Sequence, residues 1–333
     1  MTGITKEEAL RILRAPDHET LEIVSQVYRV RRAHFGNRVK LNFLVNIKSG
    51  LCPEDCHYCS QSKVSSAPID KYPFLSDEDI CRAVERAASV KAKRVCLVAS
   101  GRGPTDHEVE KVASIVRAIK TTNPEMEICA CLGLLGQSQG EKLKDAGVYA
   151  YNHNLNTSER MYGEICETHT YEDRQRTVSC AKEAGLSPCS GALFGMGETD
   201  EDRVGVIFAL REAGAESVPV NFLIPVDGTP LERRQELTPW QCLRILAMCR
   251  LVNPSAELRI AGGRELHLRS LQPLGLFIAN SIFIGDYLTT SGQAPEVDLA
   301  MIRDMEFEIE GEEGRASPPD LSDRVKLISH RNA

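Results

Sequence analysis

The sequence predicts a closed (β/α)8 barrel of the TIM type. Between residues 39 and 294, short runs of apolar or alternating residues take turns with longer segments of helical periodicity, as in a parallel sheet joined by crossover helices. The expected strands cover residues 41–47, 94–99, 127–132, 148–152, 187–193, 217–222, 258–261 and 281–284. Eight such units in one domain favour a barrel over the alternative, a doubly wound open sheet.

The two faces of these strands provide a further observation. Side chains alternate across a strand, and one face of each run is apolar, as Val95 and Leu97 illustrate. The opposite faces carry Arg94, Cys96, Cys129, Cys131, Asn152, Asn154, Asn156, Cys189, Gly191, Pro219, Asn221 and Arg259. Helices should cover the apolar faces, which leaves the polar set inside the barrel, where branched aliphatic side chains are usual. The interior is therefore predicted to be a chamber.

Two segments flank the predicted barrel. Residues 1–38 are expected to form a helical extension, because Thr5 and Glu8 make a capping box before one helical pattern and a second pattern runs over residues 19–31. Residues 295–333 lose regular patterning and become acidic, so we expect a partly flexible tail there.

Composition narrows the class of protein. The chain has 333 residues, 42% of them hydrophobic, and a net charge of -7, without a basic run of the kind that binds nucleic acid or anionic membranes. Charges interrupt the N-terminus before an apolar run reaches signal-peptide length, and no later stretch approaches a membrane span. We therefore expect a cytoplasmic enzyme with a small-molecule substrate.

The chain contains twelve cysteines, which is many for a reducing compartment and favours metal or redox chemistry over disulfides. Four of them lie on amphipathic helical patterns and are expected only to pack: Cys81, Cys180, Cys242 and Cys249.

Three other cysteines, Cys52, Cys56 and Cys59, follow the first expected strand and so should lie on a loop at the catalytic face of the barrel. A structural zinc site takes four protein ligands, whereas this loop offers three cysteines with His57 between them. Cys-x3-Cys-x2-Cys suits a cubane iron-sulfur cluster with one iron left free of protein, and zinc remains the alternative.

This triplet, with Tyr58 as the aromatic before the last cysteine, resembles the signature of radical S-adenosylmethionine enzymes. The segment CPEDCHYCSQS resembles the form found in the biotin synthase family. The resemblance continues in consistent order, over about residues 35 to 290, through RVCLVASGRGPT, EICACLGLL, YNHNLNTSERMY, CSGALFGMGET, VPVNFLIPVDGTPL, LRIAGGRE and ANSIFIGDYLTT.

The resemblance implies two iron-sulfur clusters. The triplet would hold a 4Fe-4S cluster whose free iron binds S-adenosylmethionine, the source of a 5'-deoxyadenosyl radical. A 2Fe-2S cluster would be held by the positions that match three strand cysteines and an arginine: Cys96, Cys129, Cys189 and Arg259. Its sulfide would be inserted into dethiobiotin to give biotin.

Further matches imply binding roles. Residues 191–198 resemble the pattern that supports the adenosine moiety and include Gly191, Gly195 and Glu198. Asn152, Asn154 and Asn221 match positions that line the substrate and adenosyl sites, where amides can pair with a ureido ring or ribose. Asn156 stands where many members have aspartate, and it can still bond a ribose hydroxyl without carrying charge.

Some residues keep alternative interpretations. Cys131 shares a strand face with Cys129 and could replace it as a ligand, and Arg259 could be an ordinary barrel arginine paired with Glu257. His57 and His153 are expected in supporting roles, and the remaining histidines at the surface.

The resemblance also implies partners: flavodoxin or ferredoxin as electron donor, iron-sulfur assembly proteins and a second copy in a homodimer. The rival functions are another barrel radical enzyme, which would need only the triplet, and a non-catalytic iron-sulfur or zinc scaffold.

Overall fold

The computed structural model describes residues 3–234 and 236–312. Eight parallel strands close into a barrel, because the last of them pairs back to the first. In sheet order they are β1 (Arg38–Lys48), β2 (Arg94–Ala99), β3 (Glu127–Cys131), β4 (Ala150–Asn152), β5 (Ser187–Cys189), β7 (Ser217–Phe222), β8 (Glu257–Ile260) and β9 (Ser281–Phe283). The predicted fold class is confirmed, and all eight expected runs contain barrel strands.

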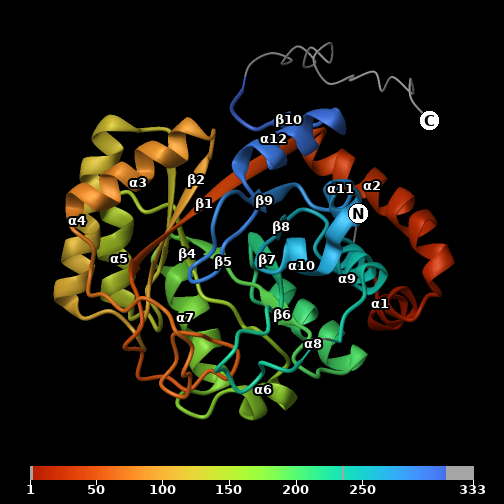
Figure 1. The fold of residues 1–333 in the computed structure, drawn as a ribbon, viewed down its shortest axis with the longest axis horizontal. Coiled ribbons are helices and arrows are strands. Elements are labelled where there is room, and N and C mark those ends of the chain that lie inside the picture. The colour runs from red at the N-terminus through yellow and green to blue at the C-terminus, as the bar shows by residue number, and fades with distance from the viewer. Residues whose placement is uncertain (1–2, 235, 313–333) are drawn as a thin grey trace, which may run out of the picture.

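Helices surround the barrel (Figure 1). They are α3 (Asp77–Ser89), α4 (Asp106–Thr122), α5 (Gln137–Asp145), α6 (Glu159–Ile165), α7 (Tyr171–Glu183), α8 (Asp200–Glu212), α9 (Pro239–Val252), α10 (Arg264–Leu268) and α11 (Gln272–Leu276). Most of the long ones begin at a serine or threonine whose side chain accepts a hydrogen bond from the third helical N–H, as Thr105 and Thr199 do.

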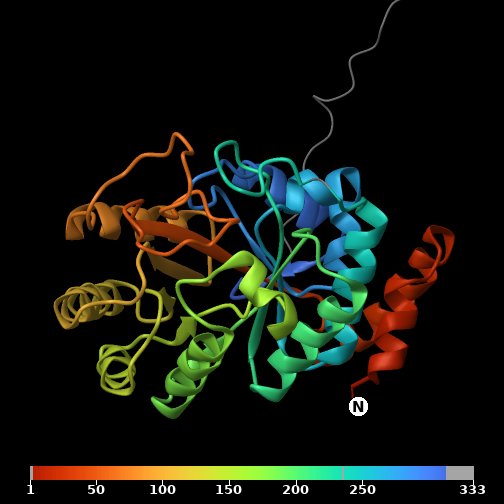
Figure 2. The same cartoon turned by 90° about the horizontal axis from the view of Figure 1, so that it is seen from below.

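The N-terminal extension is helical, as predicted. The capping box of Thr5 and Glu8 opens α1 (Lys6–Leu13), and after a short 3-10 turn (Asp17–Glu19) the chain continues as α2 (Thr20–Phe35). Figure 2 shows this pair on the outside of the barrel, where both helices pack against α9.

One predicted strand, 187–193, is divided in two. A break at Ser190 and Gly191 separates β5 from β6 (Ala192–Phe194), which pairs with β7. The carbonyl oxygen of Pro219 would lie 1.9 Å from a Cβ at position 191, so the close approach of the chains requires glycine there.

The expectation that regular structure ends at residue 294 is wrong for residues 295–309. Residues 295–304 form α12 (Pro295–Asp304), and β10 (Glu308–Ile309) pairs with the start of β1. Buried Asp298 on α12 accepts hydrogen bonds from Arg264 at 2.8 and 3.0 Å, which ties this segment to the barrel. The rest of the predicted tail, 313–333, lies outside the described residues.

Apolar side chains fill two large clusters between strands and helices, and a third, smaller cluster lies inside the barrel. Its buried members are thiols and mostly small groups: Cys96, Val98, Cys129, Ala150, Cys189, Ala261 and Phe283. The expected division of each strand into an apolar face toward the helices and a second face inside the barrel is therefore confirmed.

Of the cysteines expected only to pack, Cys242 and Cys249 are fully buried on α9. Among the described helices, none is both long and apolar enough to cross a bilayer.

Candidate active site

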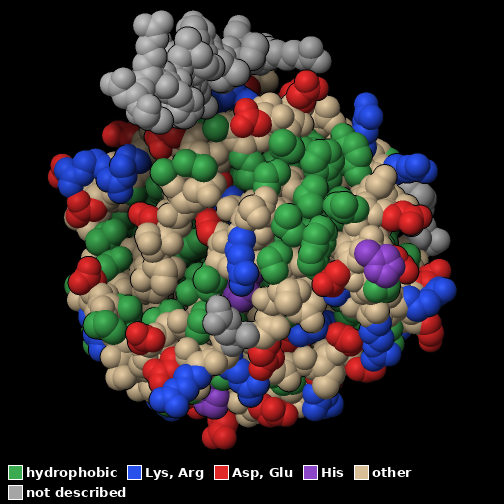
Figure 3. Space-filling model, turned by 45° about the vertical axis from the view of Figure 1, so that its right-hand side comes forward, with side chains coloured by type: hydrophobic (Ala, Val, Ile, Leu, Met, Phe, Trp, Pro, Cys, Tyr) green, Lys and Arg blue, Asp and Glu red, His purple; other side chains and the backbone are tan. Residues whose placement is uncertain are grey.

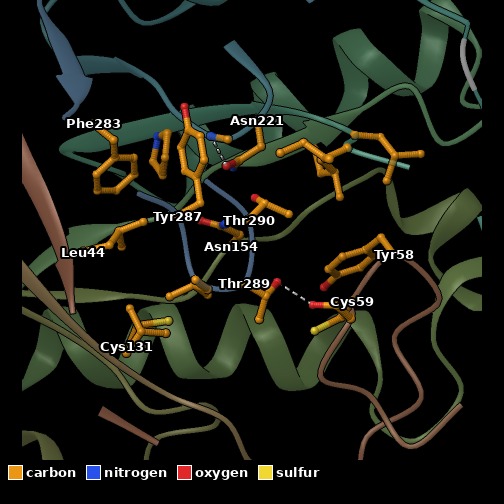
Figure 4. A pocket seen from close by; sticks show the side chains of 18 of the residues that line it. Leu44, Tyr58, Cys59, Cys131, Asn154, Asn221, Phe283, Tyr287, Thr289 and Thr290 are labelled. Carbon is orange, nitrogen blue, oxygen red and sulfur yellow. Dashed lines mark hydrogen bonds between the residues drawn. The ribbon is translucent and has the colours of Figure 1, made fainter. Parts of the chain in front are cut away.

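A cavity of about 300 Å³ opens among the carboxyl ends of the strands and the loops that follow them. Figure 4 shows Tyr58 and Cys59 at one end of this cavity and Leu44, Cys131 and Phe283 at the other. Most of its wall is apolar, with a few amides facing inward, which is the usual composition of a small-molecule site. The loop 285–290 forms part of the wall, and Thr289 is linked to Ser60 by a hydroxyl hydrogen bond of 2.7 Å.

The predicted cysteine triplet lies on the loop between β1 and α3. Backbone N–H groups of Glu54 and Gly101 face the Cys52 sulfur, and those of Gln61 and Ser62 face the Cys59 sulfur. Burial raises the pKa of Cys59 to about 11. Metal binding must therefore displace a proton from this thiol, and the N–H groups are already oriented to stabilise the resulting thiolate.

Arg174 on α7 is a site residue that no sequence pattern singled out. Its guanidinium is buried, and Nη2 lies 4.0 Å from Cys56 Sγ and 3.4 Å from the Tyr58 hydroxyl. The Tyr58 hydroxyl also accepts a hydrogen bond from Asn156 Nδ2 at 2.5 Å. Asn156 has a φ of 69°, a left-handed conformation that asparagine tolerates better than most residues. Arg174 and Asn156 thus fix Tyr58 beside the triplet, and Arg174 puts a positive charge next to Cys56.

The strand thiols Cys96, Cys129 and Cys189 come together inside the barrel. The register pairs Cys96 directly with Cys129, and both are buried with Cys189 in one cluster. The pKa of Cys189 is lowered by the neighbouring Cys129 thiol and by the charge of Arg259. The Asn152 amide also approaches the Cys189 sulfur at 3.3 Å.

Arg259 on β8 is buried and is held on several sides. Its Nη2 donates to Glu257 at 2.6 Å and to Ser217 at 3.1 Å, while Nε lies 3.3 Å from the Ser281 hydroxyl. Nη1 points to Cys189 Sγ at 3.9 Å. The pairing of Arg259 with Glu257, which was the alternative interpretation, is therefore present, together with an approach to the Cys189 thiol.

Glu257 belongs to a buried ion cluster at the opposite end of the barrel from the cavity. Three cations, Lys40, Arg94 and Arg259, meet three carboxylates, Glu127, Glu257 and Glu310. Burial alone would raise the pKa of Glu257, but the three cations outweigh it and hold that pKa well below the usual range. Glu257 therefore stays ionised and keeps Arg259 charged.

The predicted amides line the cavity, and two of them are fixed by backbone groups. Asn154 Oδ1 accepts from Asn152 Nδ2 and from Gly191 N–H, both at 3.1 Å. Asn221 accepts from Gly262 N–H at 3.0 Å and donates to the Ala192 carbonyl at 3.2 Å. Their orientations are thus set before any ligand enters.

Other predicted site residues lie behind the cavity wall. The Glu198 carboxylate accepts from the N–H groups of Gly195 and Met196 at 2.8 Å each, so it shapes the turn after β6. Two of the histidines expected at the surface, His169 and His267, are buried, and that expectation is wrong for both. His169 lies beside Cys56 and Cys166, a group that the sequence did not indicate.

Both thiol groups fit an iron-sulfur cluster by their chemistry. The triplet has N–H donors and a buried arginine around its sulfurs, which suits three thiolates on a cluster with an open iron. The strand thiols Cys96, Cys129 and Cys189 are buried in one cluster, with Arg259 and Arg94 supplying positive charge. Within the described residues no disulfide joins any of these cysteines.

Two family models match successive parts of this chain. Residues 46–210 match the Radical SAM superfamily, and residues 219–308 match the Biotin and Thiamin Synthesis associated domain. The fold resembles the FeFe-hydrogenase maturase HydG from Carboxydothermus hydrogenoformans, with a TM-score of 0.77 and 20% identity over 92% of this chain and 76% of that one. It also resembles methylornithine synthase (PylB), with a TM-score of 0.72 and 20% identity over 84% of this chain and 82% of that one. The cysteine loop, the cavity, the barrel and the family match define an enzyme of the radical S-adenosylmethionine class, and this class implies a 4Fe-4S cluster and S-adenosylmethionine as cofactors.

Curated relatives narrow the class to one family. The biotin synthase of Bacillus cytotoxicus is 59% identical over 92% of this chain and 92% of its own length. That of Streptomyces coelicolor is 59% identical over 92% of this chain and 75% of its own, and "Biotin synthase 2" of Frankia casuarinae is 58% identical over 92% and 85%. The chain belongs to the biotin synthase family, whose members are sulfur-inserting radical enzymes.

Proposed function

We propose that this chain converts dethiobiotin to biotin in the 300 Å³ cavity, with the two thiol groups as the sites of its two clusters. The proposal rests on the composition of the cavity wall. This wall includes Cys59 of the triplet and, from the strand group, Cys96 and Arg259. A substrate held there can face both groups at once, as sulfur insertion requires.

Cys52, Cys56 and Cys59 hold the 4Fe-4S cluster, which supplies one-electron cleavage of S-adenosylmethionine when bound. Tyr58, Asn154 and Asn156 contact the adenosyl cofactor from the triplet side of the cavity, and Gly191, Gly195 and Glu198 support that wall from behind. Arg174 offsets the negative charge of the thiolates. The apolar wall excludes water from the reacting carbon.

Cys96, Cys129, Cys189 and Arg259 hold the 2Fe-2S cluster that provides the sulfur. Asn152, Asn154 and Asn221 bind the ureido ring of dethiobiotin, because their fixed amides offer both donors and acceptors. Cys131 lines the cavity and pairs in register with Val98, two residues beyond the Cys129–Cys96 pair along the strand, so it acts as a wall residue and not as a ligand.

The remaining proposals concern organisation and partners. The radical S-adenosylmethionine domain covers residues 39–294, after the helices of residues 1–38, and it receives electrons from flavodoxin or ferredoxin in the cytoplasm. Assembly proteins supply its clusters.

A second copy of the chain covers apolar side chains such as Leu266 and Val297, which are 39% and 51% exposed. Figure 3 displays a face with an apolar area among interspersed acidic and basic groups, as expected of an interaction surface.

Anaerobic reconstitution tests the function. The reduced protein, given S-adenosylmethionine and dethiobiotin, should release 5'-deoxyadenosine and form biotin. A protein that cleaves S-adenosylmethionine with dethiobiotin present, yet forms no biotin while both clusters are intact, would contradict the proposal and favour another radical reaction.

A further inference from the structure

A second group of side chains that could bind a metal ion lies outside the cavity and includes Cys56 of the triplet. It consists of Cys56, Cys166 and His169, and their ligand atoms all lie within 4.8 Å of one another. Cys166 and His169 come from the loop between α6 and α7, in a Cys-x2-His spacing. All three residues are buried.

The distances within this group match a tetrahedral site. The usual Zn–S and Zn–N lengths give edges of about 3.8 Å between two sulfurs and about 3.5 Å between sulfur and nitrogen. Here Cys56 Sγ lies 3.8 Å from Cys166 Sγ, which in turn lies 3.3 and 3.9 Å from the two ring nitrogens of His169. The remaining edge, between Cys56 Sγ and the imidazole nitrogen, is no longer than 4.8 Å, so the ligands would close on an ion by about 1 Å.

The histidine is already oriented for ligation. His169 Nδ1 lies 2.5 Å from Glu54 Oε2, and a carboxylate partner requires the proton on Nδ1. Nδ1 is also the ring nitrogen nearer to Cys166 Sγ, so it is the atom that would bind the ion, which takes the place of the proton shared with the Glu54 carboxylate.

A second carboxylate, that of Asp55, lies next to Cys166. Its Oδ1 lies 3.3 Å from Cys166 Sγ and accepts hydrogen bonds from the backbone N–H groups of Glu167 and Thr168, which hold the loop in place. The site therefore combines two sulfurs, one imidazole and a carboxylate oxygen, a donor set that suits Zn²⁺.

We propose that the cluster-free chain binds one divalent transition-metal ion such as Zn²⁺ through Cys56, Cys166 and His169. Binding releases two thiol protons to solvent, and the two thiolates balance the charge of the ion. Because Cys56 also belongs to the cluster triplet, the ion and the 4Fe-4S cluster exclude each other. The site therefore makes cluster assembly sensitive to free zinc, a property beyond the proposed function.

Cobalt(II) is the probe, because tetrahedral thiolate coordination gives it intense visible bands. We would use the full-length, chelator-treated chain with Cys52→Ala, Cys59→Ala, Cys129→Ala and Cys189→Ala, so that neither of the other thiol groups keeps three cysteines. This parent should bind one Co²⁺ with tetrahedral bands. Cys166→Ala and His169→Gln should each abolish them, whereas Cys180→Ala, a distant control, should leave them unchanged.

Glu54→Gln should weaken Co²⁺ binding by about 10- to 100-fold, the usual effect of losing a carboxylate partner of a metal-bound histidine. Circular dichroism would check that each variant is folded. The proposal is overturned if the folded parent binds no Co²⁺, or if both Cys166→Ala and His169→Gln retain its affinity and spectrum.

Cluster assembly in the natural sequence provides the second measurement. Stoichiometric Zn²⁺, added before iron and sulfide, should slow the gain of 4Fe-4S absorbance, and Cys166→Ala should remove this delay. An equal delay in both proteins would contradict the shared role of Cys56. The Cys166→Ala protein should still load its cluster and release 5'-deoxyadenosine at the normal rate, so failure of this inference is distinguishable from failure of the proposed function.

Discussion

Replacing Glu257 by glutamine should damage both stability and the second cluster. The buried ion cluster contains three cations and three carboxylates, so the substitution changes its formal charge from zero to +1. Glu257 is 11% exposed and contacts Arg94, Arg259 and Lys40. Removing one partner of a buried pair costs about 3 to 5 kcal/mol, and we expect the lower end because Glu127 and Glu310 remain.

The effect on the cluster follows from the position of Arg259. Without the 2.6 Å contact to Glu257, the guanidinium keeps Ser217 and Ser281 as partners and can shift relative to Cys189. Absorption and electron paramagnetic resonance spectra of the second cluster should change, while the 4Fe-4S signals stay the same. Glu257→Asp should restore part of both properties, since it keeps the charge.

Glu127→Gln is the matched control. Glu127 shares Lys40 and Arg94 with Glu257, and its contacts in the ion cluster do not include Arg259. Denaturant unfolding of the anaerobic proteins should show a loss of stability in both variants, but the second-cluster spectrum should change only for Glu257→Gln. If that spectrum stays normal in Glu257→Gln, or changes equally in the control, Glu257 does not position Arg259.

Four further outcomes are expected. Cys56→Ala should abolish release of 5'-deoxyadenosine, because two thiolates leave the cubane labile; a comparable rate in that variant would remove the triplet from the mechanism. Cys189→Ala should keep the 4Fe-4S signal and form no biotin, while Cys131→Ala should form it, and the reverse pattern in biotin assays would exchange the two assignments. Arg259→Lys should assemble both clusters with an altered second spectrum, and complete loss of that cluster would make Arg259 an obligatory ligand. Acid should destabilise the fold, because the pKa of the Glu257 carboxyl is lowered in the folded state. The contribution of Glu257 to stability is complete above about pH 4.3, the pKa of glutamate in the unfolded chain, and is lost as pH falls toward the folded pKa. Denaturant unfolding at a series of pH values measures this loss.

The fold was predictable because its pattern is local. The alternation of apolar and polar side chains indicates each strand, and helical periodicity with a capping residue indicates each helix. Eight such strand–helix repeats leave few alternatives to a barrel. Local patterns failed where the partner was distant. The break at Gly191 depends on the Pro219 carbonyl, and the order of residues 295–309 depends on Arg264 and β1.

The sequence by itself determined the cysteine loop, the face on which each strand thiol lies, and through its resemblance the family. Spacing is enough for these features, because ligands on one loop and alternation along one strand are set by neighbours in the chain. Only the tertiary structure decided that Arg174 on α7 reaches Cys56, that Glu257 holds Arg259, and that Cys166 and His169 meet Cys56. Such contacts join elements that are far apart in sequence, and buried charges and thiols gain their chemical role from partners that only folding brings near.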